Sequence, residues 1–152
     1  MTIDLLEPLY GFTPEMWRLA KMFRREIFQS FSKNDQYGMI FTKIWYFDQQ
    51  EDWDEIEYIC NIFSSQGVEI YFVELEADVE VRILRNKTDH RLEHKPTKRN
   101  IEQSELHLLD TFESRRMNSK EAEIKTKNYI RINNTNLNSA EVALRIKREF
   151  NL

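Results

Sequence analysis

The chain carries two kinds of hydrophobic pattern, one typical of amphipathic helices and one typical of buried strands. Apolar residues recur about every 3.6 residues from 13 to 33, where Thr13 suits an N-cap and Pro14 the first helical position. Continuous runs of β-branched and aromatic residues at 39–47 and 68–75 predict strands that are covered on both faces. Helix and strand patterns therefore alternate along the first half of the chain.

Local start and stop signals predict the other elements. Gly67 suits the residue just beyond the end of a helix, Asp78 can cap the next one, and Asn138 with Glu141 resembles a capping box. These signals and the hydrophobic spacing predict helices at 56–67, 78–85, 100–117 and 138–150 and a strand at 129–133. The polar stretch 86–99 is expected to be a mobile loop.

The alternation of elements indicates the fold class. Buried strands separated by helices long enough to cross over are typical of an α/β protein with a mainly parallel sheet. Ligands of such sheets bind in the loops that follow the carboxyl ends of the strands. Those ends are expected near Asp48, Glu76 and Asn134. The loops after these three residues are the first candidate site.

The composition is that of one globular domain. The chain has 152 residues, 41% of them hydrophobic, and one cysteine, Cys60, which excludes a disulfide framework and a cysteine-based metal site within one chain. A cytoplasmic location is expected, because a lone cysteine fits a reducing compartment and neither a signal peptide nor an apolar run of about 18 residues is recognisable. The net charge of −4 argues against nonspecific nucleic-acid binding, and neither a membrane partner nor a structural metal is expected.

Charge is distributed in blocks along the chain. Six acidic residues and no basic one lie between 48 and 57, whereas seven basic and two acidic residues lie between 82 and 99. Arg82 and Arg85 are expected to share one helix face with Asp78. Guanidinium groups suit phosphate oxygens, so the basic block is a candidate clamp for an anion. A solvated helix face held by acid–arginine ion pairs explains the same pattern.

Several segments resemble a known family. The stretch VELEADVEVR at 73–82, followed by residues 85–88 and by HRLEHKPTKR at 90–99, resembles the lid region of small bacterial P-loop kinase-like proteins, which are described as AAA-family ATPases or as shikimate-kinase-like. The segment YIRINNTNL at 129–137 resembles the last strand of that family and the turn after it. The segment MTIDLLEP at 1–8 resembles the residues after its second strand. The likeness covers essentially the whole chain.

The resemblance implies a P-loop NTPase-like, three-layer αβα fold in a single domain over residues 1–152, with a lid-like segment at about 86–117. It also implies transfer of the terminal phosphoryl group of ATP to a small molecule, with Mg²⁺ as the cofactor. The residues implied to contact phosphates as the lid closes are Arg85, Arg91, Lys98, Arg99 and Arg116.

The same resemblance assigns roles to four further residues. Asn134 and Thr135 would lie near the adenine. Asp4 and Asp48 would lie on the acceptor side, where Asp48 could help to hold a metal or the acceptor. Each has a structural alternative, because the two aspartates can cap helices and the Asn-Thr pair can form a plain turn.

The chain departs from the family at the phosphate-binding loop. That loop needs G-x-x-x-x-G-K-[ST], because its glycines bring backbone N–H groups to the phosphates, whereas this chain has glycine only at 11, 38 and 67. The resemblance therefore implies that the first strand and its loop are missing, either upstream of Met1 in a longer reading frame or through genuine loss. The chain alone is expected to be inactive or weakly active, with a partner chain or an oligomer covering the missing strand.

A second function belongs to a different class. The chain can instead be a non-catalytic α/β binding or interaction module, which keeps the basic lid for a nucleotide or another small anionic ligand without turnover. A nucleotide or small anion is thus the expected partner in both interpretations, and whether the chain is an enzyme stays open at this point.

Overall fold

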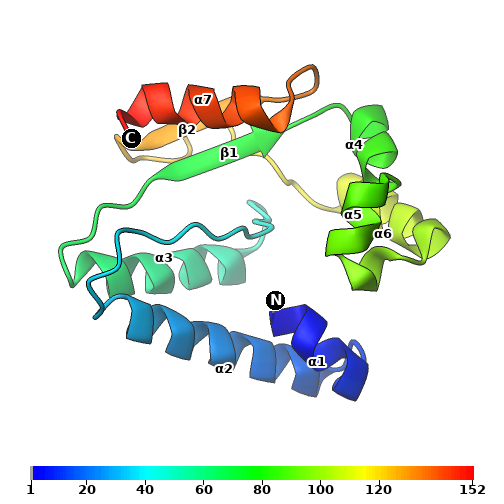
Figure 1. The fold of residues 1–152 in the computed structure, drawn as a ribbon, viewed down its shortest axis with the longest axis horizontal. Coiled ribbons are helices and arrows are strands. Elements are labelled where there is room, and N and C mark those ends of the chain that lie inside the picture. The colour runs from blue at the N-terminus through cyan, green and yellow to red at the C-terminus, as the bar shows by residue number, and fades with distance from the viewer. Residues whose placement is uncertain (1) are drawn as a thin grey trace.

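Helices dominate the computed structural model, which describes residues 2–152. Met1, the first residue of the segment 1–8 in the family resemblance, lies outside the described residues. In chain order the elements are α1 (Thr2–Tyr10), α2 (Pro14–Phe31), α3 (Gln50–Ser64), β1 (Phe72–Glu76), α4 (Val79–Asn86), α5 (Asp89–His94), the 3-10 helix η1 (Pro96–Lys98), α6 (Ile101–Ser114), β2 (Tyr129–Asn133) and α7 (Ser139–Phe150) (Figure 1).

The two strands form one parallel pair in a regular register. Phe72 lies opposite Tyr129 at one end and Glu76 opposite Asn133 at the other, and the connection between the strands carries α4, α5 and α6. Figure 1 shows α7 on one face of the sheet, while α3 and then α2 lie beyond the other face. Ile132 and Val142 are buried where α7 meets β2. Both strands point toward the end of the molecule where α4, α5 and α6 gather.

The predicted three-layer αβα fold with a mainly parallel sheet is wrong. Residues 2–152 contain a sheet of only two strands, which is too small for that architecture. The segment 39–47, predicted as a strand, is extended but unpaired, and within the described chain residues 38–45 make no backbone hydrogen bond. Ile40 is 99% exposed and Ile44 56% exposed, so the segment is not covered on both faces. A β-branched run becomes a strand only when a neighbouring strand supplies the ladder.

The extended segment is nevertheless tied to α3 and to the chain before β2. Lys43 Nζ forms ion pairs with Asp52 at 3.1 Å and Glu55 at 2.6 Å, both in α3. The N–H of Phe47 donates to the carbonyl oxygen of Arg116 at 2.9 Å. Ion pairs and a backbone hydrogen bond, not a sheet ladder, hold this part of the chain in place.

Apolar burial is concentrated between helices and is not centred on the sheet. One cluster joins α1 to α2 through Leu6, Met16 and Ala20. A second joins α2 to α3 through Phe28, Ile59 and Phe63, with partly buried neighbours that include Met39 and Ile70. Three aromatic rings, those of Trp45, Phe47 and Trp53, pack against one another with centroids 4.5 to 5.7 Å apart. The helical hairpins therefore supply most of the core of the described chain.

The predicted helix starts are confirmed where a side-chain cap is present. Thr13 accepts from the N–H of Met16, and Asn138 and Glu141 form the reciprocal capping box. Gly67 adopts a left-handed φ of +72° shortly after α3, which relieves the strain that a side chain would bring there. The stretch 86–99, predicted as a loop, folds into α5 and η1.

Candidate functional site

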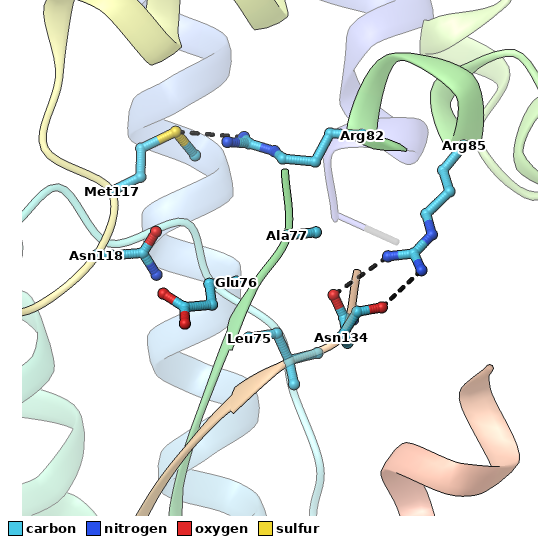
Figure 2. Close-up of a pocket in the computed structure, with 8 residues that line it drawn as sticks. All are labelled: Leu75, Glu76, Ala77, Arg82, Arg85, Met117, Asn118 and Asn134. Carbon is cyan, nitrogen blue, oxygen red and sulfur yellow. Dashed lines mark hydrogen bonds between the residues drawn. The ribbon is translucent and has the colours of Figure 1, made fainter. Parts of the chain in front are cut away.

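A cavity of about 230 Å³ opens at the carboxyl ends of the two parallel strands. In a parallel sheet this is the end at which ligands bind, because the loops and helix starts there converge on one place. Figure 2 shows Arg82 extending sideways from α4 toward Met117 and Arg85 reaching down toward Asn134, with Asn118 and Glu76 on the Arg82 side of the strand ends. The lining residues are Leu75, Glu76, Ala77, Arg82, Arg85, Met117, Asn118 and Asn134.

Two arginines line this cavity, and neither forms an ion pair within the described residues, but Arg82 is the one whose guanidinium is not engaged by oxygen acceptors. Its Nη2 lies 3.4 Å from the thioether sulfur of Met117, and its guanidinium lies 5.8 Å from the centre of the Phe112 ring. Within residues 2–152 no carboxylate forms an ion pair with it. Burial lowers the pKa of Arg82, yet a guanidinium stays charged at neutral pH. A half-buried positive charge therefore faces the cavity.

The carboxylate nearest to the cavity does not neutralise that charge. Glu76 lines the cavity, but it forms an ion pair with Arg131 of β2, and this pair raises the pKa of Arg131. Glu76 and Arg131 lie on neighbouring strands, two register positions apart, because Arg131 lies opposite Glu74. The carboxylate of Glu76 is thus already paired with a basic residue of the sheet, and it is not paired with Arg82.

Glu74 holds the Asn118 side of the cavity in place. Its carboxylate accepts hydrogen bonds from the Asn118 amide at 2.8 Å, the Ser119 hydroxyl at 2.7 Å and the Tyr129 hydroxyl at 2.9 Å. Burial acts to raise the pKa of Glu74, but these donors together outweigh it and lower the pKa below its usual value. The network fixes the loop before β2 against β1.

The guanidinium of Arg85, unlike that of Arg82, is engaged by several oxygen acceptors. Its guanidinium donates to four acceptors in the turn after β2, namely Asn134 Oδ1 at 3.2 Å and the carbonyl oxygens of Asn134 at 2.7 Å, Thr135 at 3.2 Å and Leu137 at 3.3 Å. The turn is also held from the start of α4, since the N–H of its N-cap residue Asp78 donates to the Thr135 hydroxyl at 3.0 Å. The structure thus brings together three predicted site residues, Arg85, Asn134 and Thr135, through contacts that stabilise a turn.

The rest of the predicted phosphate set lies on other elements. Arg91 is exposed on α5, and Arg99 Nε donates to the carbonyl oxygen of Leu92 at 3.1 Å. Lys98 is half-buried in η1, where burial and then the charge of Arg91 lower its pKa. None of these three residues is among those that line the cavity beside Arg82. Their contact with phosphates stays a prediction.

Arg116 and Asp48 contact each other where the end of the extended segment 39–47 meets the chain after α6. Arg116 donates to the carbonyl oxygen of Phe47 at 2.6 Å and pairs with Glu123 at 2.5 Å, an interaction that raises the pKa of Arg116. Asp48 accepts a hydrogen bond from the backbone N–H of Arg116 at 3.0 Å, so it ties the chain before α3 to the chain after α6. It does not cap α3, whose N-cap is Gln49. Asp4 lies in the first turn of α1. Roles for these residues on an acceptor side also stay predictions.

Arg82 is the residue that the sequence interpretation left out of its phosphate set. Its position on the same helix face as Arg85 is visible in the three-residue spacing. The spacing cannot reveal which of the two arginines is consumed by the turn after β2, because that turn lies about fifty residues further along the chain. The tertiary contact decides which guanidinium remains free for a ligand.

The described residues place further bounds on the site. Within residues 2–152, no group of three or more His, Cys, Asp or Glu side chains is arranged to hold a metal ion. None of the helices in this part of the chain has the length and apolar character to cross a membrane.

Comparisons of the chain with protein-family models, with curated proteins and with solved structures find no match. The resemblance to P-loop kinase-like proteins therefore stays a prediction, and the function is argued from the geometry of the cavity.

Proposed function

We propose that the protein is a binding module for a small anionic ligand, held at the carboxyl ends of β1 and β2 by the guanidinium of Arg82. The observation that carries this proposal is the half-buried charge of Arg82, which lines the cavity without a carboxylate partner among the described residues. A charge withdrawn from water is costly until it is paired, so an anion in the cavity gains more from this guanidinium than from an exposed one.

The neighbouring groups support an anion and not a cation. Glu76 is occupied by Arg131, and the Asn118 and Asn134 side chains offer amide groups at the cavity wall. The N-cap residue of α4, Asp78, makes no capping hydrogen bond with its side chain, which leaves the first turn of that helix uncapped close to Ala77. The N-terminus of a helix and a guanidinium both attract negative charge, so both favour an anionic ligand.

Binding without turnover is the form of this function that the geometry supports best. The described residues around Arg82 offer no His or Cys, and both acids nearby, Glu74 and Glu76, are engaged by donors. A nucleotide is one member of the proposed ligand class, so ATP belongs among the ligands to be tested. We place the module in the cytoplasm, in keeping with its single cysteine.

Titration calorimetry at low ionic strength tests the proposal, with pyrophosphate and ATP as probes and with and without Mg²⁺. Arg82→Gln removes the charge and keeps a polar side chain, and it should weaken binding by about tenfold or more, which is about 1.4 kcal/mol. Arg82→Lys keeps the charge without the planar fork and should weaken binding less.

The matched control is Arg145→Gln, which removes an arginine from the exposed surface of α7 and should leave binding unchanged. Equal affinities for the wild type, Arg82→Gln and Arg145→Gln, each confirmed as folded by circular dichroism, would overturn the proposal. So would the absence of binding by any anion to the wild type.

A further inference from the structure

A second cavity of about 570 Å³ lies beside the first and shares part of its wall. Leu75, Arg85 and Asn134 line both cavities. The second cavity continues from this shared wall toward the start of α7, and the residues that line it alone are Leu137, Asn138, Ser139 and Val142. The two spaces therefore lie side by side over the ends of the strands, with the Arg85–Asn134 contact in the wall that they share.

Size decides how a ligand can occupy this site. Small-molecule sites usually span roughly 300–1,000 Å³. The space beside Arg82, at about 230 Å³, is below that range and suits a compact anionic group without a large organic part. The neighbouring space, at about 570 Å³, lies well within it. A ligand larger than a simple inorganic anion must extend from the first space into the second.

The second space differs from the first in chemistry. Three aliphatic side chains line it, and of these Leu75 is 50% exposed, a large exposure for an apolar side chain in a strand. Arg85 keeps its positive charge there, but four neutral oxygen acceptors already engage its guanidinium, so it has few N–H donors left for a ligand. The N–H of Glu141 in the first turn of α7 is satisfied by the Asn138 cap, so this helix start offers an anion less than an uncapped one would. This end of the site suits an apolar group.

We infer that the ligand is an amphiphilic organic anion, whose charged head group contacts Arg82 and whose apolar ring or chain lies over Leu75 against Leu137 and Val142. This inference rests on the proposed anion-binding function and specifies the class of ligand. The shared wall sets the geometry, because Leu75 lies where the head group ends and the apolar part begins. A phosphate ester and a carboxylic acid both have the required chemistry.

Matched pairs of probes test the inference. Phenyl phosphate is compared with inorganic phosphate, and benzoate with acetate, so that each pair differs mainly by an aromatic ring. The ring should improve affinity by about tenfold in at least one pair, and the better pair identifies the head group. An equal or weaker affinity for the ringed member of both pairs would overturn the inference.

Variants on one strand separate the apolar part of the site from general effects on the sheet. Leu75→Thr introduces a β-branched residue suited to a strand and removes most of the apolar surface, so it should reduce the gain from the ring to about threefold or less. Val73→Thr is the matched control, two residues earlier on β1 and 36% exposed but lining neither cavity, and it should keep the full gain. An unchanged gain in a folded Leu75→Thr variant would contradict the inference.

A measurement on the wild type keeps the test decisive if Leu75→Thr does not fold. In methyl-resolved NMR spectra, phenyl phosphate should shift the signals of Leu75, Leu137 and Val142, whereas inorganic phosphate should not. Shifts confined to other methyl groups would overturn the inference. The two proposals fail separately: a loss of phosphate binding in Arg82→Gln without any benefit from the ring supports the anion site and rejects its apolar part.

Discussion

Arg85 Nη2 lies 2.7 Å from the backbone oxygen of Asn134, so a side chain of α4 closes the turn that follows β2. Three more contacts run from the same guanidinium to Asn134 Oδ1 and to the carbonyl oxygens of Thr135 and Leu137. Buried or half-buried carbonyl oxygens need donors, and here one side chain supplies several of them. The candidate site is therefore built on a turn that depends on an element distant in sequence.

Replacing Arg85 should destabilise the protein. Arg85→Ala leaves several turn carbonyls without their donor, and we expect the free energy of unfolding to fall by about 2–3 kcal/mol. Urea denaturation followed by circular dichroism measures the change. Arg145→Ala, on the exposed surface of α7, should alter stability by less than about 0.5 kcal/mol. Equal unfolding midpoints for the two variants would show that the turn does not need Arg85.

Glu74 should make stability depend on pH in the acidic range. Its pKa in the folded protein lies below the ordinary value of 4.5, so the folded state binds the proton less readily than the unfolded state does. The stabilisation is then complete above pH 4.5 and is lost as the pH falls through the folded-state pKa. We expect Glu74→Gln to cost about 2 kcal/mol at neutral pH and progressively less in acid.

Thermal unfolding from pH 7 down to pH 3 checks this dependence on Glu74. Other carboxylates also titrate in this range, so the informative quantity is the difference between the wild type and Glu74→Gln at each pH. Tyr129→Phe removes only one of the donors to Glu74 and should give a smaller difference. A difference that stays constant from neutral to acidic pH would contradict the prediction.

Arg116 should control the exposure of the extended segment to proteases. Its side chain joins the carbonyl oxygen of Phe47 to Glu123, so Arg116→Gln should release the end of segment 39–47. We expect cleavage of that segment by thermolysin to become about tenfold faster, because local opening becomes easier. Arg115→Gln is the control, since Arg115 makes only weaker contacts in this region, a 3.9 Å ion pair with Asp48 and a guanidinium 5.9 Å from the centre of the Tyr46 ring. Equal cleavage rates for both variants would contradict the role assigned to Arg116.

Asn86 and Ser104 should be energetically coupled. Both are 6% exposed, and they exchange hydrogen bonds at 3.0 and 3.3 Å across the contact between α4 and α6. Either replacement by Ala leaves a buried polar partner unsatisfied and should cost about 1–3 kcal/mol. The double variant should cost less than the two single variants together, by about 1 kcal/mol. Strictly additive unfolding energies would rule out the coupling.

Two helix starts were predictable because their signals are local, whereas the helices at 2–10 and 89–94 were not predicted. Thr13 before Pro14 and Asn138 before Glu141 each contain the cap and the start of a helix within four residues, and the structure confirms both. The strand at 129–133 was also predicted with the correct bounds. The sequence was sufficient to predict these helix starts because each cap bonds to a residue only three positions away.

The sheet and the site could not be predicted in the same way, because both depend on contacts between distant residues. Nothing in the run 39–47 indicates that it lacks a strand partner, and its composition alone resembles that of a buried strand. Likewise, the spacing of Arg82 and Arg85 places both on one helix face, but only the position of Asn134 shows which guanidinium is already engaged. Sequence patterns report what a segment can form, while its partners decide what it does form.

The pairing of Lys43 with α3 affects how the extended segment 39–47 can associate with other molecules. Exposed β-prone edges usually carry a charged residue that discourages edge-to-edge association between molecules. Here the only charge between Met39 and Phe47 is bound by two acidic side chains of α3, while Ile40 and Ile44 remain open to solvent. The segment therefore has little electrostatic protection against self-association, and concentrated samples should be handled at low salt and checked by light scattering.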